Sequence, residues 1–476
     1  MTKTKRIEAR GDGETHAAYA LELEEVTRPL NANAISYSDG HIMLLRNDHR
    51  SADSATSLYG DGSFDATKFL QVVRYGETVA RVAAFHLEDN IDRLRRTVSV
   101  KHEKFVHASN EEIVITSLRL LIMNGYDENW PLKQESNGQI SKASMIYQRL
   151  DVYDDNEKDP RYEKQRGRFD IGLGGPFNCA FRMTFRPVYS YLNAETEKRG
   201  AYVLASPSKR EGSYLQHKTI ANYDWSRPHK RKAMDVRCDE VMFFIGGITG
   251  SVVETSAQTP ILYKILADGK GQLWVPPYED GRLDGITALV IRRIAEKFNI
   301  EMIDHQFTLK DIANCDAFIL AGNAVGATFV SKIKRYSNDK DYAVEGMLPD
   351  PKNDIDVPLT PAGRAFFEEV IKGEFKTEVM QRGSDKYGKL LVYPDEILPD
   401  RQIAADRRLA TDLRELSAEH RAHVKDLERR YSEENGRDVV IDKGAKLGLP
   451  APLQLTGSPS RILVPTRDRL LVFKPG

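Results

Sequence analysis

Between residues 201 and 373 the sequence alternates short apolar runs with segments of helical periodicity. The runs include AYVLASP, EVMFFIGG, ILYKIL and QLWVPP, and an amphipathic helix is predicted for ITALVIRRIAEKFNI. Short apolar runs bounded by turn residues favour strands, whereas apolar residues three and four positions apart favour helices. Because 476 residues exceed one ordinary domain, we expect a mixed α/β or α+β protein of at least two domains.

The first part of the chain has elements of both kinds. ISYSDGHIMLLRN predicts a hairpin that turns at Asp39-Gly40. LEDNIDRLRRTVSV and EEIVITSLRLLIMNG have helical spacing, and Gly125 is expected to end the second helix. ASMIYQRLDVY and RMTFRPVYSYL return to strand spacing, whereas residues 1–30 are polar and are expected to form an arm.

The composition excludes several kinds of protein. The net charge of −1 provides no basic field for nucleic acid. The basic cluster RPHKRK, Arg227 to Lys232, is interpreted as a solvated face, with a phosphate-binding patch as the alternative. Cys179, Cys238 and Cys315 fit no zinc spacing, so no metal is expected, and free thiols favour a reducing compartment. We expect a cytoplasmic protein without a signal peptide or membrane span.

Four separated patches carry residues suited to a phosphorylated pyridine aldehyde. The amine of Lys218 could condense with the aldehyde, and the carboxylate of Glu254 could keep the ring nitrogen protonated. Gly285-Ile286-Thr287 opens a predicted helix whose backbone N–H groups could bind phosphate, to which Arg93 could add a bidentate contact. Any one of these patches alone is more often an ordinary surface feature. The interpretation therefore depends on the order in which all four occur along the chain.

These patches lie within motifs that resemble the fold-type IV pyridoxal-phosphate enzymes, the class IV aminotransferases, and most of all the branched-chain-amino-acid aminotransferases. The motifs are LYGDGSFDATKF, LEDNIDRL, HKTIANY, VVETSAQTP, LDGITALVIRRIAEKFNIEM and FILAGNAVGATFV. The similarity covers about residues 33 to 392 and leaves a C-terminal extension outside the family pattern.

The resemblance implies a pyridoxal 5'-phosphate site with Lys218 as the Schiff-base lysine. The cofactor-binding residues implied are Arg93, Tyr223, Glu254, Ile286, Thr287 and Asn323. The substrate-binding residues implied are Tyr59, Lys68, Tyr147, Arg149 and Ala324. For Arg149, the alternative is an ordinary cation on an edge strand.

The family fold implies an N-terminal arm, 1–30, and a small α+β domain, 31–188. A linker, 189–199, would lead to a larger, mixed β-barrel-like domain with flanking helices, 200–392. The extension, 393–476, has helical and then strand-like character. Its helical part has a narrow apolar stripe, which fits a helix docked on the body or a short coiled-coil arm.

The implied activity is amino transfer between an amino acid and a 2-oxo acid in a homodimer. An L-amino acid, branched-chain-like or specialised, is expected because no arginine-and-histidine carboxylate trap follows Arg149. Asn323, Gly326 and Ala288 depart from the family pattern. These departures leave open a lyase, eliminase or cyclase that uses the same cofactor. A catalytically silent scaffold is a third hypothesis.

Overall fold

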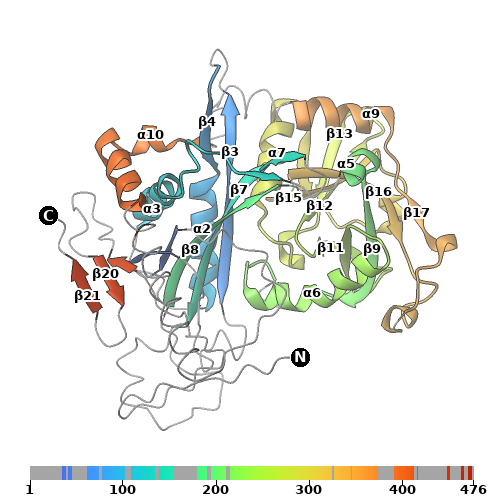
Figure 1. Ribbon diagram of the computed structural model, residues 1–476. Coiled ribbons are helices and arrows are strands. Elements are labelled where there is room, and N and C mark those ends of the chain that lie inside the picture. Colours follow the sequence, from blue (N-terminus) through green and yellow to red (C-terminus); the bar gives the residue numbers. More distant parts are fainter. Residues whose placement is uncertain are drawn as a thin grey trace, which may run out of the picture.

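A computed structural model describes residues 35–38, 41–44, 62–73, 78–101, 109–134, 139–154, 179–189, 194–210, 215–323, 326–344, 346–373, 391–411, 415, 448–450, 462–465 and 470–473. The predicted arm, 1–30, lies outside these residues, as do Tyr59 and Ala324. Two large sheets with their own helices lie side by side (Figure 1).

The first sheet contains ten described strands in the order β18-β4-β3-β7-β8-β1-β2-β19-β20-β21. Its pairs are antiparallel, which lets neighbouring strands follow one another through short turns. The strands from the first part of the chain are β1 (Ile35–Ser38), β2 (His41–Leu44), β3 (Ser63–Val73), β4 (Ala80–Phe85), β7 (Met145–Asp154) and β8 (Cys179–Val188). A separate two-stranded ribbon consists of β5 (Leu132–Gln134) and β6 (Ile140–Lys142).

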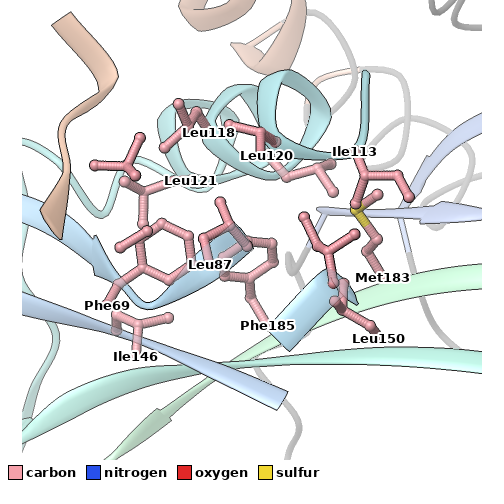
Figure 2. Packing of buried hydrophobic residues seen from close by; sticks show 14 of the residues in the cluster. Phe69, Leu87, Ile113, Leu118, Leu120, Leu121, Ile146, Leu150, Met183 and Phe185 are labelled. Atoms are coloured by element: carbon pink, nitrogen blue, oxygen red, sulfur yellow. The ribbon is translucent and has the colours of Figure 1, made fainter. Parts of the chain in front are cut away.

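Helices α2 (Leu87–Lys101) and α3 (Asn110–Met123) pack on one face of this sheet. In α3, Ser109 and Glu112 form a reciprocal capping box, and Gly125 has a φ of 72° just beyond the helix, as its predicted role requires. Figure 2 shows leucines of these helices meeting Phe69, Ile146 and other apolar side chains of the strands. This core fixes α2, and with it Arg93, against the sheet.

The second sheet contains nine described strands in the order β11-β10-β9-β16-β15-β12-β13-β14, with β17 paired to β16. It is mixed, because β9 pairs in parallel with both β10 and β16 while most other pairs are antiparallel. The strands are β9 (Ala201–Lys209), β10 (Glu240–Ile245), β11 (Ser251–Thr255), β12 (Thr259–Ile265), β13 (Gly271–Val275), β14 (Glu301–Asp304), β15 (Ala317–Gly322), β16 (Gly326–Lys334) and β17 (Ile355–Asp356).

Helices accompany this sheet at several points (Figure 1). Part of the predicted linker forms a short helix, α5, and within the segment LTPAGRAFFEEVIKGE a helix begins as α9 and continues as a π-helix. The elements are α5 (Ala194–Arg199), α6 (Ile220–Asp235), α7 (Ile286–Lys297), α8 (Leu309–Ile312), α9 (Pro361–Ala365) and the π-helix Phe366–Gly373. Short 3-10 turns lie at Tyr278–Asp280, Asp341–Ala343 and Pro351–Asn353.

The two sheets share a buried apolar cluster. Val72, Ala83 and Phe85 of the first sheet pack in one cluster with residues of β12, α7 and β15. Phe85 is 1 % exposed, so the contact is fully dry. The junction between the sheets is therefore held by a core of its own, and the candidate site described below lies at this junction.

The C-terminal extension adds to the first sheet and its helical layer. β18 (Leu391–Val392) pairs with β4, and α10 (Pro394–Ile397) leads into a helical segment at 400–411. Ala410 is buried in the core beside α3, and Arg119 forms an ion pair of 2.8 Å with Asp406. The described part of the predicted extension is thus docked on the body, in agreement with one of the two expectations.

At the end of the extension, β19 (Gly448–Pro450) pairs with β2, followed by β20 (Ile462–Pro465) and β21 (Leu470–Phe473). These strands agree with the strand-like character expected there. The boundaries of the predicted domains stay predictions. None of the helices that the structure describes is both long and apolar enough to span a membrane.

Candidate active site

The lysine segment is held against the start of β3 in the first sheet. The backbone N–H of Phe64 donates to Lys218 O at 3.1 Å, and Ile220 N–H donates to Gly62 O at 2.9 Å. The side chain of Thr219 caps α6 by accepting from Asn222 N–H at 3.4 Å. These bonds fix Lys218 in the short connection before α6, with its side chain free to turn toward the junction.

The amine of Lys218 lies next to the hydroxyl of Tyr223, one turn into α6. Lys218 Nζ donates to Tyr223 Oη at 2.6 Å and lies 4.8 Å from the centre of the Phe64 ring. Burial and, next in importance, the nearby positive charge of Arg93 together lower the pKa of Lys218 to about 7. Burial also raises the pKa of Tyr223 to about 12. A free amine is therefore available near neutral pH beside a hydroxyl that keeps its proton.

Glu254 occupies the end of β11 and is 3 % exposed. Its carboxylate accepts from Leu283 N–H at 2.9 Å and from Thr255 N–H at 3.2 Å. Burial raises the pKa of Glu254 to about 7, while the charge of Arg210 acts in the opposite direction. This carboxyl group can therefore gain or lose a proton with little cost near neutral pH.

Arg93 is 4 % exposed and joins three parts of the fold. Its Nε and Nη2 form a bidentate pair with Asp65 of β3, at 2.8 and 2.7 Å. Its Nη1 donates to Asp284 O at 2.8 Å, two residues before α7, and Nη2 also donates to Asn90 Oδ1 at 3.2 Å. The bidentate contact that was expected with phosphate is thus made with Asp65. Of the five N–H groups of a guanidinium, one on Nη1 is left for another acceptor.

The start of α7 lies beside this arginine. Gly285 precedes the helix without a side-chain cap, and a Cβ there would lie 2.7 Å from Thr259 Oγ1. The backbone N–H groups of a first helical turn have no intrahelical partner and favour an anion. Ile286 and Thr287 belong to that turn. Thr287 Oγ1 is buried without a hydrogen-bond partner among the described residues.

Asn323 ends the turn after β15 and points back to the first sheet. Its Nδ2 donates to Ala66 O and, at 3.2 Å, to Asn90 Oδ1. Its Oδ1 has no partner within the described part of the chain. The structure therefore brings Asn323 next to the Asp65–Arg93 pair, at the point where both sheets meet.

The described substrate-binding candidates lie along one face of β3 and β7. Alternation along a strand places Phe64, Ala66 and Lys68 on the same face, where Lys68 pairs with Tyr147 and Ala66 with Arg149. The Arg149 guanidinium lies 4.1 Å from the centre of the Phe64 ring, and its Nε contacts Asp151 at 2.6 Å. Arg149 thus lies near Lys218 on β7, an inner strand between β3 and β8, with 37 % of its side chain exposed.

Lys68 and Tyr147 lie farther along this face. Burial lowers the pKa of Lys68 to about 8, and its amine lies 4.7 Å from the centre of the Phe85 ring. The Tyr147 ring has the Arg186 guanidinium 5.1 Å from its centre. These two residues are therefore in the same row as Arg149 but have their own aromatic and cationic neighbours.

The sequence analysis did not single out Asp65, Asn90 or Arg210. Arg210 is 7 % exposed, and its Nη1 donates to Thr255 O at 3.1 Å, next to Glu254. The only signal for Arg210 was a charged residue at the end of an apolar strand, eight positions before Lys218. Asp65 stood inside the strand-like run SFDATKFL, where a carboxylate requires a buried partner.

The fold defines the class of protein. The branched-chain aminotransferase from Thermoproteus uzoniensis, solved with norvaline, aligns with a TM-score of 0.56 and 19 % identity over 76 % of this chain and 99 % of that chain. The branched-chain amino acid aminotransferase of Escherichia coli aligns with the same TM-score and coverage at 15 % identity. The enzyme from Thermobaculum terrenum, in its pyridoxal-phosphate form, aligns at 0.52 and 16 % with the same coverage. The expected fold-type IV architecture is confirmed.

A comparison with known protein families matches one part of the chain. Residues 176–333, which contain Lys218, Glu254, Thr287 and Asn323, match the family described as amino-transferase class IV. This match covers about one third of the chain, and the fold over 76 % of the chain is that of the solved branched-chain aminotransferases. No curated protein sequence matches the chain.

Proposed function

We propose that this site binds pyridoxal 5'-phosphate and that the protein transfers an amino group between an amino acid and a 2-oxo acid. The observation that carries the proposal is the buried amine of Lys218, with its pKa lowered to about 7, in a junction that also holds Tyr223, Glu254 and Arg93. The electrostatic influence of Arg93, Glu254 and Arg149 on Lys218 supports their closeness to the amine.

The polar groups around the junction fit a phosphorylated pyridine aldehyde. The unused N–H of Arg93, the first turn of α7 and the Thr287 hydroxyl would hold the phosphate. Glu254 would face the ring nitrogen, and Arg210 would keep part of that carboxyl group ionised. Tyr223 would hydrogen-bond the phenolic oxygen. Asn323 Oδ1 and Arg210 Nε are further buried groups that lack partners among the described residues.

The cofactor would supply an electrophilic carbonyl and a protonated ring that accepts electrons released at the substrate Cα. Lys218 would bond to the carbonyl in the resting protein and later hold and deliver the proton of the substrate Cα at Nζ. A base works best when its pKa is near the working pH, which supports this role for an amine with a pKa of about 7. Tyr223 would orient Nζ through the 2.6 Å hydrogen bond.

For the substrate, we propose an L-amino acid, branched-chain-like or specialised, with Lys68, Tyr147, Arg149, Tyr59 and Ala324 around it. The row formed by Lys68, Tyr147 and Arg149 on one sheet face supports this assignment. Norvaline in the T. uzoniensis structure is a short apolar amino acid bound by a protein of this fold.

We further propose a homodimer, which light scattering would test against the 53.8 kDa of one chain. A cytoplasmic location is also proposed, and the buried free thiols of Cys238 and Cys315 support it. Fractionation of the native source would test it.

Reduction with borohydride tests the central claim. Protein incubated with pyridoxal 5'-phosphate should be labelled at Lys218, and Lys218→Ala should lose the label while Lys230→Ala keeps it. Peptide mass spectrometry reads the position, and labelling elsewhere in both variants would contradict the assignment. Incubation with L-leucine or L-glutamate plus a 2-oxo acid should then show amino transfer. Release of pyruvate or ammonia without transfer would instead indicate the lyase alternative.

A further inference from the structure

A cavity of 740 Å³ runs beside α6, and most of its lining residues have no role assigned above. It is bounded by one face of α6, the turn before β10, the turn after β11 and the end of β15. The basic cluster of the sequence contributes Arg227 and Lys230 to its wall. The cluster is therefore not only a solvated face, because two of its residues line this open cavity.

The inner end of the cavity belongs to the proposed active site. Tyr223, which accepts the hydrogen bond of Lys218, is part of the lining. Ser256 and Ala257 follow Glu254 by two and three residues, and Gly322 precedes Asn323, and all three line the cavity as well. A molecule attached at Lys218 could therefore extend into this space.

The cavity is long compared with a short aliphatic amino acid. It follows α6 from Tyr223 to Met234, which are eleven positions apart. At about 1.5 Å for each helical residue, this distance is about 16 Å. An amino acid with four or five carbons would occupy only the part nearest to Tyr223.

The lining as a whole has an excess of positive charge. The lining contains four cations, Arg199, Arg227, Lys230 and Arg237, and two carboxylates, Asp239 and Glu240. Arg199 pairs with Asp239 at 2.9 Å and Lys230 pairs with Glu240 at 3.2 Å.

Arg227 and Arg237 are the other two cations of the lining. Both are exposed, and neither forms an ion pair with any residue that the structure describes. Guanidinium groups with free N–H donors bind carboxylate and phosphate oxygens.

We propose that this cavity receives the side chain of an elongated substrate and that Arg227, about one helical turn from Tyr223, and Arg237, beyond Met234, attract a carboxylate or phosphate carried by that side chain. This inference rests on the proposed function and specifies its substrate class: an amino acid, or its 2-oxo acid, with an anionic group several bonds beyond Cα. The paired cations Arg199 and Lys230 shape the wall, and Arg227 and Arg237 select the charge.

The test compares two series of amino donors of equal length with the cofactor-loaded enzyme. One series carries a terminal carboxylate, from L-glutamate to 2-aminopimelate and 2-aminosuberate, and the other ends in a methyl group. We expect kcat/KM to rise with length in the carboxylate series only. The advantage of the carboxylate should shrink as salt is raised, because both arginines are exposed.

Variants then assign the effect to the arginines. Arg227→Ala and Arg237→Ala should each lower kcat/KM for the long carboxylate donors about 10-fold, as expected for one charged hydrogen bond at an exposed site, and leave the methyl series unchanged. Arg231→Ala is the matched control, since Arg231 is an exposed cation of the same helix outside the lining. Arg227→Lys should restore part of the loss.

Three results would overturn the inference: equal losses in both series, no loss in either arginine variant, or the same loss in Arg231→Ala. Inorganic phosphate that inhibits both series equally would indicate a separate anion and would also overturn it. Calorimetric binding of pimelate provides a second readout. If no amino acid reacts while pimelate binding still depends on the two arginines, the proposed function fails and the anion site stands.

Discussion

Replacing Glu254 with glutamine tests whether burial controls the ionisation of this carboxyl group. In the cofactor-free protein, burial raises its pKa from 4.5 to about 7. Below pH 4.5 the folded and unfolded chains both carry the proton, so folding has no ionisation cost. As the pH rises from 4.5 to about 7, the unfolded chain loses its proton first, and the folded state loses stability relative to it.

The magnitude follows from the two pKa values. Each pH unit between 4.5 and about 7 corresponds to about 1.4 kcal/mol, which gives about 3 kcal/mol above pH 7. Glutamine has no such titration but has only one acceptor for the N–H groups of Leu283 and Thr255. That loss does not depend on pH. The informative quantity is therefore the change with pH in the stability difference between the variant and the wild type.

Urea unfolding of both cofactor-free proteins between pH 5 and 8.5 measures this quantity. We expect the glutamine variant to gain about 2 to 3 kcal/mol relative to the wild type across this range. Glu279→Gln, at an exposed position, should show no such trend. A flat difference for Glu254→Gln, or one that favours the wild type at high pH, would refute the reasoning, because the carboxylate would then ionise as easily as in water. Pyridoxal 5'-phosphate should stabilise the wild type more than the variant.

Two further substitutions test the phosphate site and the docked extension. Arg93→Ala should raise the dissociation constant for pyridoxal 5'-phosphate about 10- to 100-fold, measured by fluorescence quenching, because it removes a buried charged donor and releases Asp65; unchanged affinity would remove Arg93 from the site. Asp406→Ala should lower the free energy of unfolding by about 2 to 3 kcal/mol because it leaves Arg119 unpaired, whereas Arg407→Ala, in an exposed pair, should cost less than about 1 kcal/mol. Equal effects of the two changes would contradict docking through the Arg119–Asp406 pair.

Much of the fold was predictable because its signals are local. The strands of the second sheet have apolar runs of strand length, and α7 has apolar residues three and four positions apart. The five-residue spacing of Lys218 and Tyr223 spans the start of α6, so this one helix brings the two side chains to the same end of it. Contacts that depend on a single helix or strand were therefore the easiest to predict from the sequence.

The parts that could not be predicted depend on packing between distant elements. Asp65 and Arg93 are 28 positions apart, and only the packing of α2 on β3 makes them a bidentate pair. Asn323 contacts Ala66 and Asn90 from the other sheet, more than 230 positions away. No periodicity in the sequence records such contacts. For this reason the sequence led us to expect a bidentate contact between Arg93 and phosphate and did not reveal Asp65 as a partner of Arg93.

These distant contacts explain why the site and the junction of the two sheets depend on each other. Arg93 holds Asp65 of the first sheet and the backbone just before α7 of the second region at the same time. Asn323 makes a second link between the same regions. Both links depend on the dry cluster around Phe85, because a shift between the sheets would lengthen the bonds from Arg93 to Asp284 and from Asn323 to Ala66. Any change in that cluster should therefore alter the anion-binding end of the site before it alters Lys218, which is held by β3, by Thr97 of α2 and by Tyr223 of α6.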